Sequence, residues 1–280
     1  MKKYKIKSVL EIASDEKYYY LIQTNRVLRY NKDFKKDSFI KMKNPSYVAS
    51  DIVLNLLIVI NTDSIVNVYS YDNLELLNSY KLDYDYRDSK YDGSTHTLYA
   101  STYNSYMRIN KLWSINLLTN EIKSKSMTFG YIYGFIEFNT EKLFLKEIKV
   151  DPNGSTCMIV EVNNKFDIIN KIQYANSHMD DFLNINLVYD CFTIYDIPNN
   201  NLHILRDIGI NEKILYVKYI QDKYFLWSIW NMHILDSNFN YIKTFKSEIQ
   251  FLNVYMDDKF IVVLDEYIEV YDDIEEYLAN

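Results

Sequence analysis

Glycine, proline and cysteine are all scarce in this chain. Its 280 residues include 5 glycines, 3 prolines and 2 cysteines. One possible cysteine pair cannot supply a disulfide framework. With so few glycines and prolines, most turns must be made by Asn and Asp. Their side chains bond to the nearby backbone, and they tolerate left-handed conformations.

Long hydrophobic runs and an excess of positive charge are also missing. The longest apolar run, residues 56–60, is far too short to cross a bilayer. Residues 1–10 alternate polar and apolar types and lack the apolar core of a signal peptide. The formal net charge is −7, and lysines are scattered among Asp and Glu, so no basic patch for phosphates is evident. We therefore expect a cytoplasmic protein with neither a membrane nor a nucleic-acid partner.

The chain lacks the sequence motifs of common catalytic and nucleotide-binding sites. Neither a Gly-x-Ser-x-Gly motif, a phosphate-binding loop nor a Gly-x-Gly-x-x-Gly motif occurs. Cys157 and Cys191 are candidate nucleophiles by type alone. Cys191 opens an apolar strand-like segment, which is typical of a small buried hydrophobe. These features favour a non-enzymatic protein without a cofactor.

Two acidic segments invite a metal hypothesis. His178, Asp180 and Asp181 lie close in sequence, but a metal site needs three or four converging ligands, so a polar turn is the preferred interpretation. Residues 83–93 resemble a calcium loop superficially, yet Arg87 occupies a position that requires Asp or Asn. We interpret this segment as a solvated loop and predict no metal site.

Hydrophobic and aromatic residues are abundant instead. Hydrophobic residues make up 48% of the chain and aromatic residues 16%, and tyrosine alone supplies 28 residues. A chain of this composition can bury a sizeable core. Tyrosine suits β-strands, because its ring packs on the pleated surface while its hydroxyl reaches a polar edge.

A short strand-like segment followed by a turn residue recurs along the chain. Each segment is followed by Asn, Ser or Asp, which start turns through side-chain bonds to the backbone. The spacings between segments run from 33 to 47 residues and average about 40, the size of a four-stranded propeller blade. The last strand residues of the seven segments are Tyr30, Tyr69, Ile115, Val162, Tyr195, Leu235 and Tyr271.

A second pattern lies upstream of several of these segments. An acidic residue and a lysine precede an apolar strand at Lys17, Lys142, Lys223 and Lys259. The apolar runs at 54–60 and 260–264 are nearly continuous, which indicates strands buried on both faces. Sheets sandwiched between neighbouring sheets meet that condition.

These patterns predict an all-β fold, a seven-bladed β-propeller of four-stranded antiparallel blades that forms one domain over residues 1–280. In the second repeat we expect strands at 54–60, 65–69 and 76–82. The N-terminal segment 3–9 alternates like an outer strand, so we expect it to pair with the last blade and close the ring, which removes two exposed edges. Six or eight blades, or paired sandwiches, are the alternatives.

The repeat resembles that of WD40-like propeller proteins. The matching residues are the strand ends at 193–196 (Thr-Ile-Tyr-Asp) and 269–272 (Glu-Val-Tyr-Asp), where the WD40 pattern has Trp-Asp. The resemblance covers nearly the whole chain in periodicity, whereas the Gly-His element is absent. It implies a platform that binds a protein or peptide partner.

The loops expected on one face of such a fold carry tyrosine, tryptophan and arginine, the residue types that anchor interfaces. We therefore predict a non-enzymatic interaction scaffold. The alternatives are an enzyme or small-ligand binder with its site in a central channel, and a structural subunit of a larger assembly. The predicted partner-binding residues are Tyr84, Tyr86, Arg87, Tyr91, Tyr103, Tyr106, Arg108 and Trp230.

Overall fold

Strands form almost all of the regular structure. The computed structural model describes residues 1–127, 131–138, 142–151, 154–174, 181–184, 187–189, 193–196 and 201–279. Over these residues the strands pair into seven four-stranded antiparallel sheets. The predicted all-β class is therefore confirmed. The chain divides into two compact units, residues 13–178 and residues 1–12 with 179–280.

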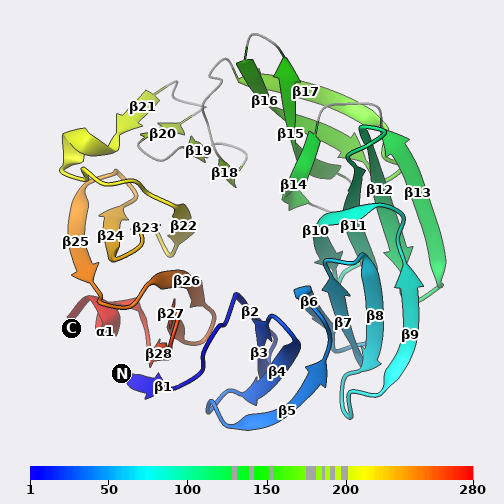
Figure 1. Ribbon diagram of the computed structural model, residues 1–280, viewed down its shortest axis with the longest axis horizontal. Helices are drawn as coiled ribbons and strands as arrows, with labels where there is room; N and C mark the ends of the chain where they lie inside the picture. The colour runs from blue at the N-terminus through cyan, green and yellow to red at the C-terminus, as the bar shows by residue number, and fades with distance from the viewer. Residues whose placement is uncertain are drawn as a thin grey trace. The chain divides into compact units, whose positions relative to one another are not determined.

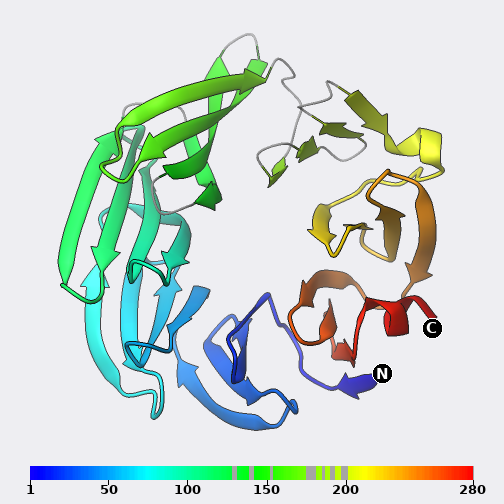
Figure 2. The same ribbon diagram turned by 180° about the vertical axis from the view of Figure 1, so that it is seen from behind.

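The first unit holds four sheets, drawn from blue to green in Figures 1 and 2. In each of them the strands lie in chain order. The first sheet contains β2 (Glu11–Ser14), β3 (Tyr18–Gln23), β4 (Arg26–Asn31) and β5 (Lys36–Lys41). The second contains β6 (Pro45–Asp51), β7 (Leu56–Asn61), β8 (Ile65–Ser70) and β9 (Leu76–Lys81). The third contains β10 (Asp85–Asp92), β11 (Thr97–Asn104), β12 (Ile109–Asn116) and β13 (Glu121–Met127). The fourth contains β14 (Tyr131–Phe138), β15 (Lys142–Asp151), β16 (Gly154–Asn163) and β17 (Ile168–Tyr174).

The second unit holds three sheets and the two short helical segments of the described chain, the 3-10 helix η1 (Leu205–Ile208) and α1 (Ile274–Ala279). One sheet contains β18 (Asp181–Asn184), β19 (Leu187–Tyr189), β20 (Thr193–Asp196) and β21 (Asn201–Ile204). The next contains β22 (Tyr216–Ile220), β23 (Lys223–Trp227), β24 (Asn231–Asp236) and β25 (Tyr241–Lys246). The last contains β26 (Phe251–Met256), β27 (Phe260–Leu264), β28 (Ile268–Tyr271) and β1 (Lys2–Tyr4).

The predicted repeat matches these sheets. All seven anchor residues, from Tyr30 to Tyr271, lie on the third strand of their sheet. The three strands expected in the second repeat agree with β7, β8 and β9 to within two residues at each end. The prediction for residues 83–93 is wrong, because most of this segment is the strand β10 and not a solvated loop. Its polar side chains are accommodated because it pairs along its length with β11.

Within a sheet, the second strand is more buried than the fourth. Every described residue of β27 is buried, and β7 is buried except at its first residue, as their apolar runs predict. The fourth strands β9 and β13 are exposed at nearly every position. The second and third strands therefore meet neighbouring sheets through both faces, while the fourth strand forms an outer edge.

The same turn joins the third and fourth strands in three sheets. It begins at Asn31, Asn163 or Asp236, whose side-chain oxygen accepts backbone N–H groups two and four residues further on, at 2.8–3.1 Å. The residue three positions on has a positive φ, and in all three turns it is a phenylalanine. A bulky residue rarely adopts this conformation, so tertiary packing must offset its cost.

These phenylalanines pack against tyrosines of the adjoining strands. Phe239 stacks on Tyr224 of its own sheet at 4.5 Å between ring centroids and on His203 of β21 at 3.7 Å. Phe166 meets Tyr99 of the preceding sheet edge to face, at 6.4 Å. The turn thus places a buried ring between neighbouring sheets. The Asn or Asp of this turn can be recognised in the sequence, whereas the phenylalanine three residues on was not predicted.

The N-terminal strand completes the last sheet, as predicted, although it is shorter than expected. β1 pairs antiparallel with β28, with Lys2 opposite Val270 and Tyr4 opposite Ile268. Figures 1 and 2 show β1, in dark blue, beside the red β28. The following residues Ile6 and Val9 are buried. This segment therefore contributes backbone pairing and apolar packing to the unit that contains the C-terminus.

Removing residues 1–9 is expected to lower the free energy of unfolding by about 3–5 kcal/mol, because β28 loses its partner strand and two buried side chains are lost. Urea unfolding followed by circular dichroism measures this change. Lys2→Gln is the control, since it keeps the backbone pairing of β1 and should change stability by less than about 0.5 kcal/mol. An unchanged unfolding curve for the truncated protein would contradict the assigned role of β1.

Asn31→Ala is expected to cost about 1–2 kcal/mol of stability, because two backbone N–H groups lose their acceptor. Ser70→Ala is the matched control. Ser70 occupies the same place in the next repeat, but among the described residues its side chain makes none of the hydrogen bonds of its turn, which come from backbone atoms, the Asn73 side chain and Arg29. Ser70→Ala should change the urea midpoint of unfolding little. Equal losses in the two variants would show that the Asn side chain does not fix the turn.

Candidate protein-binding surface and cavity

Five of the predicted binding residues lie at one end of the third sheet. Asp85 pairs with Tyr103, so the turn before β10 and the turn between β11 and β12 share this end. These turns and the adjoining strand ends position the five residues, which we call the turn-end surface. They are Tyr84, Arg87, Tyr103, Tyr106 and Arg108. Of these, Tyr103 is only 2% exposed, so its ring is not available to a partner.

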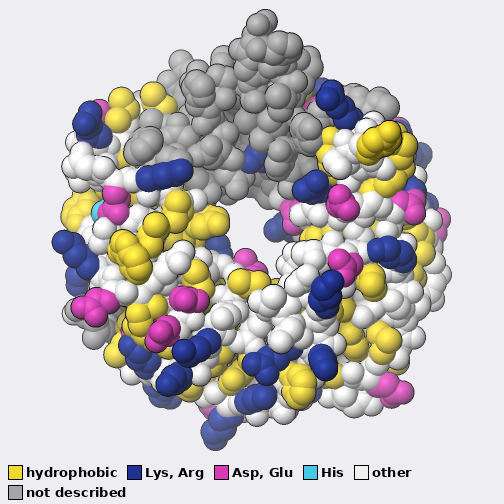
Figure 3. Space-filling model, in the orientation of Figure 1, with side chains coloured by type: hydrophobic (Ala, Val, Ile, Leu, Met, Phe, Trp, Pro, Cys, Tyr) yellow, Lys and Arg dark blue, Asp and Glu magenta, His cyan; other side chains and the backbone are white. Residues whose placement is uncertain are grey.

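The turn between β11 and β12 projects its side chains into solvent. Tyr106 is 96% exposed and its neighbour Met107 is 50% exposed. The turn is fixed locally, because the side chain of Asn104 accepts a hydrogen bond from the Met107 N–H at 2.9 Å. In Figure 3, at the upper right, hydrophobic side chains form a raised patch over this end of the sheet, with basic side chains beside it. An exposed tyrosine held on a fixed turn loses little conformational freedom on binding.

Two arginines belong to the same surface. A register shift between Tyr86 and Asp88 makes Arg87 a bulged residue, and its guanidinium lies 5.4 Å from the centre of the Tyr103 ring. Within the described chain, neither Arg87 nor Arg108 forms an ion pair. Lys111 differs, because its ammonium is held by the carboxylate of Asp83 at 2.6 Å. The turn-end surface thus presents two guanidinium groups with free hydrogen-bond donors.

The other three predicted residues lie elsewhere. Tyr86 is half-buried, and its hydroxyl is 2.8 Å from the Ser89 hydroxyl. Tyr91 pairs with Leu98 at the opposite end of the sheet, where its hydroxyl donates to Asp51. Trp230 is 52% exposed in the turn between β23 and β24, in the other unit. Burial and internal hydrogen bonds give Tyr86 and Tyr91 structural roles.

Asp51 is the centre of the network that contains Tyr91. Its carboxylate also accepts from the Leu54 N–H at 2.9 Å and lies 2.6 Å from Nδ1 of His96. Burial alone would raise the pKa of Asp51, but the bonds from Tyr91, Leu54 and His96 outweigh burial and lower it below its ordinary value. The network joins the second sheet to the third.

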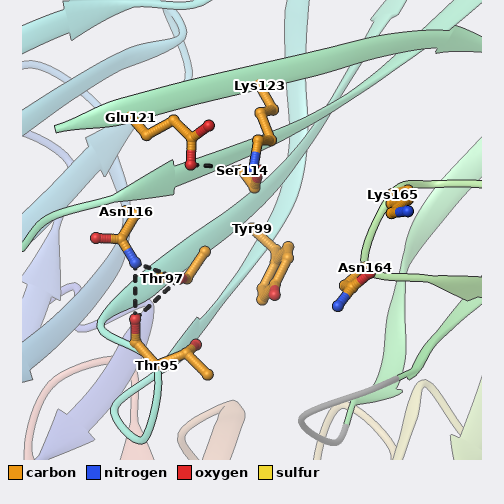
Figure 4. Close-up of a pocket in the computed structure, with 9 residues that line it drawn as sticks. All are labelled: Thr95, Thr97, Tyr99, Ser114, Asn116, Glu121, Lys123, Asn164 and Lys165. Carbon is orange, nitrogen blue, oxygen red and sulfur yellow. Dashed lines mark hydrogen bonds and ion pairs between the residues drawn. The ribbon is translucent and has the colours of Figure 1, made fainter. Parts of the chain in front are cut away.

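A half-open pocket of about 570 Å³, here called the cavity, lies between the third and fourth sheets at the end of the third sheet opposite the turn-end surface. Cross-strand pairing aligns two rows on one face. Thr97, Asn116 and Glu121 form the first row, and Tyr99, Ser114 and Lys123 form the second. Asn164 and Lys165 complete the lining from the turn between β16 and β17, and Thr95 lies beside the first row (Figure 4). This cavity was not predicted, because the alternation of lysines in β13 is typical of any exposed outer strand.

The metal and nucleophile hypotheses receive no structural support in the described residues. Among them, no group of three His, Cys, Asp or Glu side chains lies close enough to hold a metal ion. His178, Asp180 and Cys191 lie outside the described residues, and Cys157 lies on β16. Neither helical segment of the described chain has the length and hydrophobicity needed to cross a membrane.

No family model and no curated protein matches the chain. Its structure is similar to that of U3-55K, a WD40 β-propeller protein, with a TM-score of 0.67, 10% sequence identity and coverage of 95% of each chain. The similarity is one of fold. It supports the predicted WD40-like architecture, and at this identity it says nothing of a specific partner.

Asp51→Asn is expected to reduce the loss of unfolding free energy that accompanies a fall in pH from neutral to acid. Because the folded pKa of Asp51 is lowered, its contribution is fully present above the ordinary aspartate pKa and is lost as pH falls through the folded value. Urea unfolding of both proteins at several pH values from neutral to acid tests this. The control is Asp63→Asn, which removes the same charge from a half-exposed site. Parallel profiles for the wild type and Asp51→Asn would refute the role of this network.

Proposed function

We propose that the chain is a single seven-bladed propeller domain that acts as a non-enzymatic protein-interaction scaffold. Seven four-stranded sheets and the similarity to a WD40 propeller support this architecture. The pairing of β1 with β28 supports closure by the N-terminal strand, which is a common way for propellers to remove sheet edges.

The observation that carries the proposed function is the exposure of Tyr106 on a surface that also carries two arginines, which form no ion pair within the described chain. Most tyrosines of the first unit are buried or bonded internally, as Tyr20, Tyr71 and Tyr91 show. Tyr106 has instead nearly its whole side chain in solvent, next to the apolar Met107. Tyrosine and arginine are the types enriched among residues that dominate binding energy at interfaces. The turn-end surface is therefore assigned as the partner-binding face.

The partner fits this surface through two kinds of contact. A hydrophobic recess on the partner covers Tyr106 and Met107, and carboxylates or backbone carbonyls accept from Arg87 and Arg108. Tyr91 is bonded to Asp51 at the opposite end of the sheet and takes no part in this contact. Trp230 lies in the other unit and is not part of the turn-end surface.

The double variant Tyr106→Ala, Arg108→Ala is expected to lose the partner while it keeps its fold. Proteins retained from an extract of the source cells by the wild-type chain are identified by quantitative mass spectrometry. The affinity of each retained protein is then measured for the wild-type chain and for the double variant. A loss of about 2 kcal/mol or more, close to thirtyfold in Kd, is expected for a residue at the centre of an interface.

Leu118→Ala is the matched control for this experiment. Leu118 is 61% exposed on the same sheet, in the turn between β12 and β13 at the opposite end. The partner affinity and the thermal unfolding of the Leu118→Ala variant should equal those of the wild type. If the double variant retains every partner at wild-type affinity, the turn-end surface is not the binding face.

A further inference from the structure

The outer edge of the second sheet is open to another strand. β9 is the last strand of this sheet, so within the described chain one of its edges has no partner strand. β9 is exposed at every position except Tyr80, and its first two residues, Leu76 and Leu77, are 52% and 55% exposed. Residues 76–80 carry no charge. A neutral, exposed edge of this kind is a template for pairing with another chain.

Each of the other outer strands in the described chain has a composition or a length that opposes such pairing. Lysines lie within β13, β17 and β25, charged residues open β1 and β5, and β21 is only four residues long. A charge would have to be desolvated beside an incoming strand, and a very short edge offers few backbone groups. The only lysine of β9 is its last residue, Lys81. A bulge lies at Leu77, but residues 78–81 pair regularly with β8.

The two ends of β9 carry opposite charges. Glu75 directly precedes the strand, Lys81 ends it, and both are exposed. The Lys81 ammonium donates to the backbone carbonyl of Asp63, and the Glu75 carboxylate accepts from the Asn73 amide at 3.5 Å, so neither forms an ion pair within the described chain. If two β9 strands pair antiparallel about Asn78, Glu75 of each copy lies beside Lys81 of the other. A parallel pair would place like charges together.

We propose that two copies of this chain associate through antiparallel pairing of their β9 strands. Backbone groups on the two free edges bond to each other, and the exposed Leu76 and Leu77 are removed from water. At Ser79 a carbonyl of the second copy replaces the local bond from the N–H to the Asn78 side chain, which is 2.8 Å long. Both copies use the same edge, so the contact closes at a dimer. The proposal goes beyond the scaffold function, because it uses none of the turn-end residues.

The opposite charges at the ends of β9 make the proposal testable by charge reversal. Sedimentation velocity of the full chain, from low to high micromolar concentration, is expected to show a reversible equilibrium between monomer and dimer. Glu75→Lys and Lys81→Glu each place like charges side by side at both ends of the pair, and each is expected to weaken the dimer about tenfold. An equimolar mixture of the two variants is expected to recover the wild-type affinity, because in a mixed dimer each introduced charge lies beside one of opposite sign.

Lys41→Glu is the matched control, because Lys41 is the exposed last residue of β5, as Lys81 is of β9. This variant should dimerise with wild-type affinity, and thermal unfolding checks that every variant is folded. A wild-type chain that stays monomeric at every concentration, or that grows beyond a dimer, would overturn the proposal. So would a mixture that associates no more tightly than either charge-reversed variant alone, or an equal weakening by Lys41→Glu and Lys81→Glu.

Discussion

Burial of both faces of the most apolar inner strands is the constraint on which the rest of the structure depends. Strands such as β7 and β27 are apolar at almost every position, so neither face can be left in water. Each hydrophobic cluster accordingly combines side chains from neighbouring sheets: one joins Ile58 to Trp113, and another joins Tyr99 to Phe135. Since the faces are used for packing, only the strand ends, the turns and the outer edges remain available for recognition. The turn-end surface and the outer edge of β9 both lie at such positions.

The outer strands show why exposed apolar residues alone do not define an interface. β13 and β25 carry exposed Ile122 and Ile242, but lysines alternate with them along the same strands. Charged side chains on an edge oppose pairing with another chain, because a lysine would have to be desolvated beside the incoming strand. The turn between β11 and β12 differs. There an exposed tyrosine and methionine adjoin arginines whose guanidinium groups can bond to a partner.

How much of this structure the sequence predicts depends on whether the stabilising interactions are local or join residues far apart in the sequence. The third strands and their turns follow from local features, a short apolar segment and an Asn or Asp that bonds to its own backbone, and they were predicted correctly. β10 was not predicted as a strand, because its Asp and Ser residues give the segment the composition of a loop. Ser89 is 1% exposed and Asp92 6% exposed. Tyr91 and Tyr106 are equally plausible surface residues in sequence, and only the contact of Tyr91 with Asp51, forty positions upstream, separates them.

The scarcity of glycine and proline also bears on how binding groups are held. In this chain Asn and Asp side chains fix the turns by accepting backbone N–H groups, and the same residues determine where neighbouring side chains point. Asn104 fixes the turn that exposes Tyr106, and Asn73 fixes the turn that leads into β9. Groups that are ordered before a ligand arrives bind with a smaller entropy cost. The turn residues that replace glycine and proline therefore do more than reverse the chain, because they preorganise the turn-end surface and the start of β9.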